Sequence, residues 1–273
     1  MNHLISITGA GPGDPELLTV KAHKRLANAE VVLYDALPGN AILKLAPANA
    51  LFIYAGKLTN DGQNQAIRQQ AINFTILEMA RKGKRVVRLK GGDPMIFGRG
   101  AEEIRFCKQQ GLNYEVIPGV TAAMAASCEF EIPLTERKNS SMVLLYTASR
   151  TNGQFDHLDS VVQVLKSGST VSVYMGLKNL SLLADALIDA GIPDNTFVNI
   201  LSNVSHPTGG SLCGSLANIG LIIEVERPAT PAVLLIGKYA EKICAEQKKV
   251  KQNRMETYSV AETTDAELHV YNE

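Results

Sequence analysis

Tryptophan is absent from this sequence of 273 residues, and aromatic residues make up only 5% of it. The four cysteines, Cys107, Cys128, Cys213 and Cys244, are scattered, with no CxxC pair and no Cys/His spacing typical of a zinc site. We therefore expect no metal and no disulfide framework, and we interpret the cysteines as thiols in a reducing cytoplasm. No apolar run reaches the length of a membrane span, so we expect no membrane partner.

An excess of either charge is also lacking. Lys and Arg together number 27, as do Asp and Glu, so the formal net charge is zero. A neutral chain lacks the general electrostatic attraction on which nucleic-acid binders rely, and we expect no nucleic-acid partner. The 45% of hydrophobic and 20% of charged residues are typical of a globular protein, and the length fits two domains or one large α/β unit.

Short β-rich runs alternate with longer stretches of helical period, a pattern typical of βαβ units and a largely parallel sheet. In the first half we expect strands over residues 4–8, 31–34, 51–54, 85–89 and 114–117, and helices over 16–28, 65–81, 101–110 and 121–127. In the second half we expect strands over 142–146, 170–174, 198–201 and 233–236, and helices over 158–166, 180–190 and 216–224. The Gly209-Gly210 pair and the alternation that follows it predict an antiparallel excursion.

A polar, proline-containing segment at residues 132–141 separates the two series, and we place a domain boundary there. The sequence thus predicts an N-terminal α/β lobe over 1–136 with a mainly parallel sheet and a C-terminal α/β lobe over 141–244 with a mixed sheet. Residues 245–273 are polar and have a composition typical of disordered segments. We interpret them as a solvated tail rather than a site. Two lobes joined by one linker predict a cleft, where small molecules usually bind.

The first predicted strand runs into a glycine-rich loop, TGAGPGDPE at residues 8–16. It is not a dinucleotide fingerprint, because the third glycine would fall on Asp14 and Pro12 has no N–H to offer a phosphate. Asp14 is suited to cap a helix that begins at Pro15, which places a carboxylate at the positive helix end. A ligand without phosphate fits this loop better, and a tight turn with no ligand is the alternative.

Two further loops follow predicted strands. In VVRLKGGDPMIFGRG at residues 86–100, Gly91 and Gly92 allow the backbone to approach a ligand closely. Asp93 is either an acceptor for ligand hydroxyl or amino groups or the cap of the next turn. The run PGVTA at residues 118–122 is a similar turn. Because the carboxyl ends of parallel strands meet at one edge of a sheet, we expect the three loops to lie together.

Other short motifs accompany these loops: GAGPGDPELLT (9–19), YD (34–35), GK (56–57), IPLT (132–135), YMG (174–176) and PA (231–232). Together with the string LKGGDPMIFGRG at residues 89–100, they resemble the uroporphyrinogen-III C-methyltransferases of the tetrapyrrole methylase family. The similarity is collinear from about residue 4 to about residue 238, and the second loop is its most specific part.

The resemblance implies two α/β domains of the tetrapyrrole methylase type, a homodimer, and S-adenosylmethionine held at an active site in the cleft between the lobes. This cofactor has no phosphate, which agrees with the interpretation that a ligand without phosphate fits the first loop. Its product is S-adenosylhomocysteine. Val204 stands where the family commonly has Ala. By motif, the resemblance assigns cofactor binding to Pro12, Gly91, Gly92, Asp93, Ile96, Thr121, Ala122, Met175, Val204 and Ala232.

The implied reaction methylates C2 and C7 of uroporphyrinogen III to give precorrin-2, on the way to sirohaem or cobalamin. The resemblance makes Asp35 the proton acceptor and Lys57 the proton donor or a substrate contact. From the residues alone, Asp35 could equally stabilise a turn and Lys57 could be a solvated lysine. Because the substrate carries eight carboxylates, the cleft of a neutral chain must be locally basic. The candidate substrate contacts are Arg88, Lys90, Arg99, Arg137 and Arg150, with Lys178 as a further basic residue near a loop end.

Departures from the family pattern cluster on the substrate side. Leu58 replaces an arginine, Glu136 a histidine, and Ala148-Ser149 a Gly-His pair. Methyl transfer is therefore more firmly indicated than the acceptor. The alternatives are another methyltransferase of the tetrapyrrole methylase type, with a different precorrin or a non-tetrapyrrole acceptor, and a non-catalytic module that binds S-adenosylmethionine or a tetrapyrrole. The presence of Asp35 and Lys57 argues against the module.

Overall fold

The computed structural model of the chain describes residues 5–56 and 65–240. Contacts divide it into two compact units, of which the first contains residues up to 129 together with 203–209, and the second contains 130–202 and the residues from 210 onward. The division thus falls a few residues before the segment 132–141 expected from composition, and one short segment returns to the first unit. The predicted tail over 245–273 lies outside the described residues.

The first unit is built on a five-stranded sheet in the order β3-β2-β4-β1-β5. Every pairing in it is parallel, with Ile5 of β1 opposite Val86 of β4 and Tyr114 of β5. The predicted parallel sheet is confirmed, and each predicted strand is found to within one residue. The strands are β1 (Ile5–Gly9), β2 (Val31–Tyr34), β3 (Leu51–Tyr54), β4 (Val86–Lys90) and β5 (Tyr114–Ile117).

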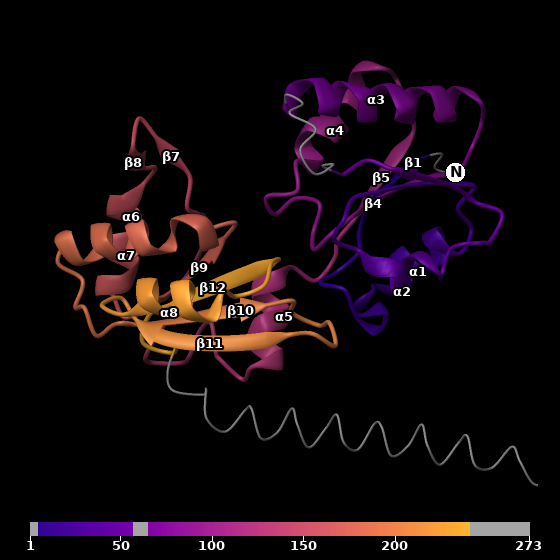
Figure 1. The fold of residues 1–273 in the computed structure, drawn as a ribbon. Helices are drawn as coiled ribbons and strands as arrows, with labels where there is room; N and C mark the ends of the chain where they lie inside the picture. Colours follow the sequence, from indigo (N-terminus) through magenta and orange to yellow (C-terminus); the bar gives the residue numbers. More distant parts are fainter. Residues whose placement is uncertain (1–4, 57–64, 241–273) are drawn as a thin grey trace, which may run out of the picture. The chain divides into compact units, whose positions relative to one another are not determined.

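Helices cover both faces of this sheet, with α3 and α4 on one side and α1 and α2 on the other (Figure 1). On the α3 side, Ile7 and Leu33 pack with Ile76, and on the other side Val32 and Leu89 pack within a second apolar cluster. Burial on both faces is why β1, β2 and β4 are largely apolar, whereas the edge strand β3 is mostly exposed. The helical segments are η1 (Pro15–Leu17), α1 (Val20–Leu26), α2 (Gly39–Leu43), α3 (Gln65–Arg81), α4 (Gly100–Gln109) and α5 (Ala122–Glu129).

The predicted helix over 16–28 is divided in two. Asp14 caps a single 3₁₀ turn by accepting a hydrogen bond from the N–H of Glu16 at 2.8 Å. Thr19 then caps α1, because its Oγ1 accepts the N–H of Ala22 at 3.1 Å. The first glycine loop therefore leads into one short turn rather than a long helix.

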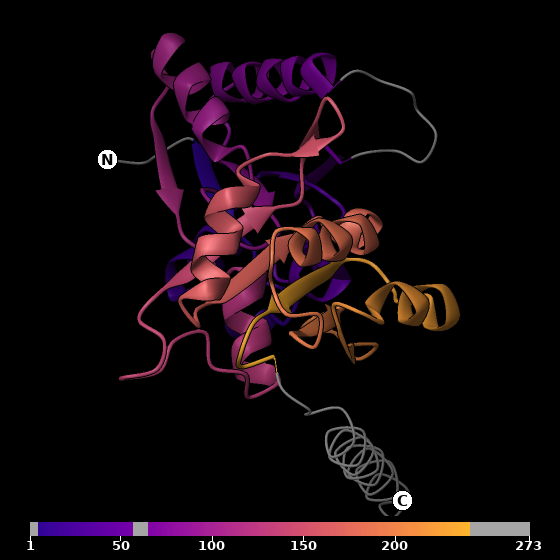
Figure 2. The same cartoon turned by 90° about the vertical axis from the view of Figure 1, so that its left-hand side faces the viewer.

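The second unit holds a mixed sheet in the order β11-β10-β12-β9-β6, in which only β6 and β9 are parallel. The antiparallel excursion is confirmed, since β11 runs back along β10 with Gly210 opposite Ser202. A hairpin of β7 and β8 projects from this unit and was not predicted, because each of its strands has two residues (Figure 1 and Figure 2). The strands are β6 (Val143–Thr147), β7 (Arg150–Thr151), β8 (Gln154–Phe155), β9 (Thr170–Tyr174), β10 (Phe197–Ser202), β11 (Gly210–Ser215) and β12 (Ala232–Ile236), and the helical segments are α6 (Leu158–Lys166), η2 (Leu177–Asn179), α7 (Leu180–Asp189) and α8 (Ile219–Glu226).

Within residues 5–56 and 65–240, no helix is long and apolar enough to cross a membrane. The longest of them, α3, has 17 residues, whereas a span takes about 20 apolar residues. The cytoplasmic location inferred from the cysteines stays a prediction.

A buried carboxylate joins β5 to β1 and α1. The side chain of Glu115 is 7% exposed and accepts hydrogen bonds from Ser6 Oγ at 2.9 Å and from the Arg25 guanidinium, while Lys21 Nζ lies 2.8 Å from its Oε2. Burial by itself would raise the pKa of Glu115, but the hydrogen bonds from Arg25, Lys21 and Ser6 outweigh it and hold that pKa at about 2. Both carboxylate oxygens are thus satisfied.

The charge of Glu115 makes the stability of the chain depend on pH. Because its pKa is lower in the folded chain, the stabilisation is present above about pH 4.5 and is lost as the pH falls toward 2. We expect Glu115→Gln to reduce the free energy of unfolding by about 2 kcal/mol at pH 7, with the difference from the parent shrinking below pH 4.5. Urea unfolding at a series of pH values measures this, and a difference of equal size at pH 2.5 and pH 7 would contradict it.

Candidate functional site

The first and second glycine loops are joined by backbone hydrogen bonds at the carboxyl edge of the parallel sheet. The N–H of Gly11 donates to the carbonyl of Gly92 at 3.1 Å, and the N–H of Gly92 donates to the carbonyl of Gly11 at 2.7 Å. The N–H of Ala10 donates to the carbonyl of Lys90 at 2.7 Å. The expected meeting of these two loops is confirmed.

Asp93 links the second loop to the third. Its Oδ1 accepts the N–H of Met95 at 2.7 Å, as a cap of the following turn does, and its Oδ2 accepts the N–H of Gly119 at 3.0 Å. Both oxygens therefore accept hydrogen bonds from the backbone, which favours the interpretation of Asp93 as a cap. Each oxygen keeps a second lone pair, so contact with a ligand stays a prediction.

Glycine is required where the three loops approach one another. A Cβ built on Gly9 would lie 2.6 Å from the nitrogen of Gly119 and 2.7 Å from the carbonyl oxygen of Gly92. Real Cβ atoms essentially never come so close to backbone atoms, and here two of the three loops would have to move apart. The three loops form one compact backbone cradle, a name we use for residues 9–13, 91–93 and 118–121.

The cradle and its flanks hold most of the residues predicted to bind the cofactor. Val204, on the segment 203–209, is buried in the same unit, whereas Met175 and Ala232 belong to the second unit. Met175 is exposed and has a positive φ of 53°. The predicted residues of the cradle and its flanks are Pro12, Gly91, Gly92, Asp93, Ile96, Thr121 and Ala122.

The segment 203–209 is attached to the first unit by specific contacts. The N–H of Ser205 donates to Glu129 Oε2 at 2.7 Å. The imidazole of His206 lies against Gly13, where a Cβ would overlap the ring. Gly13 also has a φ of 142°, so glycine is needed there on both counts. This contact could not be predicted from the sequence, because it joins positions that are far apart along the chain.

Asp35 follows β2 and lies beside the end of β4. Its Oδ1 accepts the N–H of Leu37 at 3.1 Å, so the expected turn contact is present. Its Oδ2 lies 3.9 Å from Nη2 of Arg88, and its side chain is 24% exposed. Asp35 thus has one oxygen fixed by the backbone and one directed at a cation. Lys57 and Leu58 lie outside the described residues.

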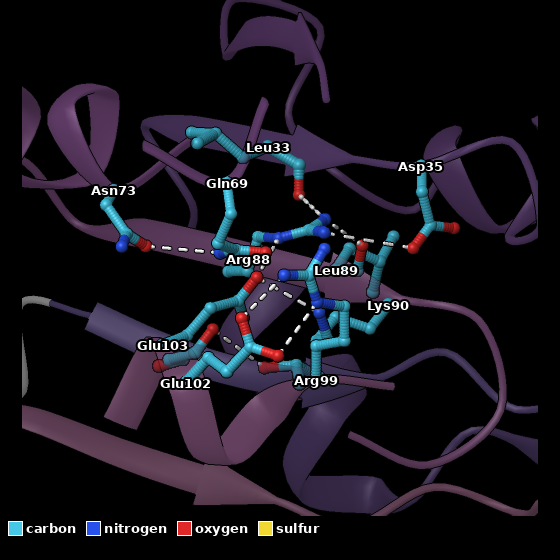
Figure 3. Close-up of polar contacts among 12 residues, drawn as sticks. Leu33, Asp35, Gln69, Asn73, Arg88, Leu89, Lys90, Arg99, Glu102 and Glu103 are labelled. Atoms are coloured by element: carbon cyan, nitrogen blue, oxygen red, sulfur yellow. Dashed lines mark hydrogen bonds and ion pairs between the residues drawn. The ribbon is translucent and has the colours of Figure 1, made fainter. Parts of the chain in front are cut away.

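Arg88 and Lys90 are buried, with exposed fractions of 3% and 4%. Arg88 Nε and Lys90 Nζ both donate to Oε1 of Glu103 on α4, at 3.1 and 3.0 Å (Figure 3). Burial lowers the pKa of Lys90 and the charge of Arg88 lowers it further, while Glu103 acts in the opposite direction. This burial argues against contact between either side chain and a substrate carboxylate, and it assigns both of them a role inside the protein.

Glu103 was not found from the sequence, although a signal was present. Arg88 and Lys90 stand two positions apart in an otherwise apolar strand, so they point to the same face of the sheet. Two cations on one face of a strand that is buried throughout require a buried anion. The identity of that anion depends on how α4 packs on the sheet.

The other predicted substrate contacts differ in their surroundings. Arg99 is exposed at the start of α4 and pairs with Glu102, with 2.6 Å between Nη2 and Oε2. Arg137 is exposed in the second unit. Arg150 donates from Nε and Nη2 to the carbonyl of Gly153, and its guanidinium stacks over Phe155 within the hairpin. Arg99, Arg137 and Arg150 are therefore all exposed, but donors of Arg99 and Arg150 are already engaged within the chain.

The departures at Glu136, Ala148 and Ser149 have local structural roles. Glu136 Oε2 accepts hydrogen bonds from Asn139 Nδ2 at 2.5 Å and from the hydroxyl of Tyr239 at 2.8 Å, and these bonds lower its pKa. Ala148 is buried and its carbonyl accepts a hydrogen bond from the side chain of Asn179, while Ser149 Oγ lies 3.1 Å from Thr147 Oγ1.

A five-stranded parallel sheet with three joined glycine loops at its carboxyl edge, followed by a mixed-sheet unit, matches a known class of enzyme. Residues 5–218 match the family model of the tetrapyrrole (corrin/porphyrin) methylases. The chain belongs to this family, and the resemblance drawn from the sequence is confirmed.

Relatives over most of the chain are named as methyltransferases of uroporphyrinogen III. The S-adenosyl-L-methionine-dependent uroporphyrinogen III methyltransferase of Methanosarcina barkeri is 37% identical over 85% of this chain and 90% of its own length. A siroheme synthase of Psychrobacter sp. is 42% identical over 87% of this chain but only 48% of the relative. The chain therefore spans about half the length of the siroheme synthases that it matches.

The fold also matches solved structures. The uroporphyrin-III C-methyl transferase of Thermus thermophilus, crystallised with S-adenosylhomocysteine, is 33% identical, with a TM-score of 0.72 over 86% of this chain and 97% of that chain. The predicted fold class, an α/β protein with one parallel and one mixed sheet, is thereby confirmed.

Proposed function

We propose that this chain transfers methyl groups from S-adenosylmethionine to C2 and C7 of uroporphyrinogen III, giving precorrin-2 and S-adenosylhomocysteine. The observation that carries the proposal is the backbone cradle beside Asp35, in a chain 37% identical to a named uroporphyrinogen III methyltransferase. The cradle supports binding of the cofactor and Asp35 supports the removal of a proton. The siroheme synthases are longer, and we propose only the methylation step for this chain.

The residues of the cradle fit a cofactor that has no phosphate. Pro12 offers no N–H to a phosphate, and Asp14 already caps the short 3₁₀ turn that follows. Gly9, Gly92 and Gly119 leave the edge of the sheet lined by backbone. We assign binding to Pro12, Gly91, Gly92, Asp93, Ile96, Thr121 and Ala122, and propose that Met175, Val204 and Ala232 contribute. When bound, the cofactor supplies a methyl group activated by the positive charge on sulfur.

Little acid or base strength is needed for the attack itself, because an electron-rich pyrrole carbon is already a nucleophile. Holding the two reactants in line can contribute about 7 to 11 kcal/mol of the reduction in the barrier. A new bond from the pyrrole carbon to the methyl carbon forms as the bond from that methyl to sulfur breaks, and the methylated ring system then releases a proton. Asp35 Oδ2 accepts that proton, while the N–H of Leu37 holds Oδ1 in place.

Recognition of the eight substrate carboxylates falls to exposed cations in this proposal. Arg137 keeps this role, with Lys57 as donor or contact, because an Arg fork pairs with a carboxylate in two places at once. Arg99 can take it only by giving up its own two-point pair with Glu102. Arg88 and Lys90 do not fit it, since both are buried against Glu103. Arg150 fits it less well, since the β7–β8 hairpin already uses its donors.

A homodimer is also part of the proposal. It is supported by the resemblance and by apolar side chains that the described part of the chain leaves exposed on α8, Leu221 and Val225. They adjoin Leu212 of β11, which forms an edge of the mixed sheet. Light scattering of the purified chain measures the mass directly.

The test of the function is incubation of the purified chain with S-adenosylmethionine and uroporphyrinogen III. We expect a product whose mass has increased by two methyl groups and whose absorbance is that of precorrin-2, together with S-adenosylhomocysteine. Binding of the cofactor without any product would contradict the proposal and favour a non-catalytic module. Product formed only from an already methylated precorrin would favour a related methyltransferase.

A further inference from the structure

Four charged side chains form a cluster that links α4, β4 and the end of β2. They are Asp35, Arg88, Lys90 and Glu103, which we call the buried charge cluster (Figure 3). Arg88 and Lys90 are almost fully buried, and Glu103 is completely buried. The cluster contains two basic and two acidic side chains.

The two carboxylate oxygens of Glu103 differ in their hydrogen bonds. Both cations donate to Oε1, while the buried Oε2 has no hydrogen-bond partner among the described residues. Glu115 provides a contrast in the same unit, since both of its oxygens are paired with surrounding donors. An unpaired buried oxygen reduces stability. The hydrogen bonds of Glu103 thus serve only to hold the two neighbouring cations through Oε1.

Arg88 is held in one orientation by contacts on several sides. Its Nε donates to Glu103, and its Nη1 donates to the carbonyls of Leu33 at 3.4 Å and Leu89 at 3.0 Å. The remaining nitrogen, Nη2, lies 3.9 Å from Oδ2 of Asp35 (Figure 3). Because the guanidinium is rigid and planar, fixing Nε and Nη1 also fixes the direction of Nη2.

We propose that Glu103 is a positioning residue for methyl transfer, acting on Asp35 through Arg88. Its carboxylate balances one of the two buried cations and holds the guanidinium so that Nη2 faces Asp35. Without that charge, Arg88 and Lys90 repel each other in a site that water does not reach, and Asp35 loses a fixed partner. The inference rests on the proposed role of Asp35 as proton acceptor.

The first test is Glu103→Gln, which keeps the shape of the side chain and removes its charge. We expect the single-turnover rate to fall by about ten- to a hundredfold, because small displacements of a catalytic group slow reactions to this extent. The KM for the macrocycle and the Kd for S-adenosylmethionine should stay within about twofold, since the variant touches neither ligand. Equal losses in rate and in both affinities would overturn the proposal.

Glu115→Gln is the matched control. It also removes a buried carboxylate that two cations surround in the first unit, and it lies outside the proposed machinery. We expect it to lower stability and leave the single-turnover rate unchanged. A loss of rate as large as that of Glu103→Gln would show that any buried charge has this effect, and would overturn the specific role of Glu103.

A double-mutant cycle separates positioning from general damage. If Glu103 acts through Asp35, Glu103→Gln should have little further effect on the rate in an Asp35→Asn background. If the two losses multiply while Asp35→Asn alone is slow, the role of Glu103 is overturned and that of Asp35 stands. If Asp35→Asn alone retains full rate, the proposed function of Asp35 is overturned.

A second variant tests the proposal independently, in case Glu103→Gln fails to fold. Arg88→Lys keeps a positive charge in the buried charge cluster and removes the forked group that reaches Asp35. We expect it to lower the single-turnover rate by about tenfold or more, with the Kd for S-adenosylmethionine unchanged. An Arg88→Lys variant of full rate would overturn the proposed path from Glu103 to Asp35.

Discussion

Asp35→Asn is expected to slow methyl transfer by about 10² to 10⁴-fold, the usual contribution of a general base. The amide keeps the size of the carboxylate and cannot take up the proton that leaves the methylated ring. The Kd for S-adenosylmethionine should stay within about twofold, because the backbone cradle is untouched. Single-turnover experiments with product detected by mass, together with calorimetry of cofactor binding, measure the two quantities.

Asp185→Asn is the matched control for this experiment. Asp185 is an exposed residue of α7 in the second unit, and its replacement makes the same chemical change. We expect it to leave rate and affinity unchanged. A single-turnover rate equal to that of the parent in Asp35→Asn would exclude the proton-acceptor role.

Gly119→Ala is expected to have the second large effect, on cofactor binding. A Cβ at this position would lie 2.9 Å from the Cα of Gly9 and would collide with the carbonyl oxygen of Gly92. The backbone there cannot move freely, because Gly11 and Gly92 exchange two hydrogen bonds and Asp93 accepts the N–H of Gly119. We expect the affinity for S-adenosylmethionine to fall by about a hundredfold and the free energy of unfolding to fall by about 2 to 3 kcal/mol.

Calorimetry and urea unfolding measure these two effects. Gly210→Ala serves as the comparison, because a Cβ on Gly210 meets nothing within 4 Å and its φ is not positive. Both quantities should be almost unchanged in that variant. Unaltered cofactor affinity in a folded Gly119→Ala variant would show that the cradle does not hold the cofactor.

The fold could be predicted from the sequence where the signals are local. The strands of the parallel sheet give short apolar runs, and the strands over 31–34, 51–54 and 114–117 have the bounds that were expected. Apolar residues at spacings of three and four likewise indicate α3. The β7–β8 hairpin and α2 were missed because segments of two to five residues show no measurable period.

The site could be predicted only in part, for a physical reason. Glycine, proline and aspartate at the ends of strands determine the local backbone, so the three loops of the cradle are visible in the sequence. The spacing of Arg88 and Lys90 in an apolar strand indicates that an anion must face them, but it does not identify that anion. Arg88 and Lys90 were therefore expected to face the substrate, whereas α4 packs so that Glu103 meets them inside the protein.

The segment 203–209 has a consequence for the synthesis of the chain. Domains usually fold in order as they leave the ribosome, the N-terminal one first. Here the first unit is incomplete when residue 129 has been made, because Ser205 pairs with Glu129 and His206 covers Gly13. Residues 130–202, which include β6, β9 and β10, must be translated before that piece exists. While these strands are being synthesised, the first unit of the nascent chain is therefore incomplete. A fragment that ends at residue 129 lacks the segment 203–209 of that unit.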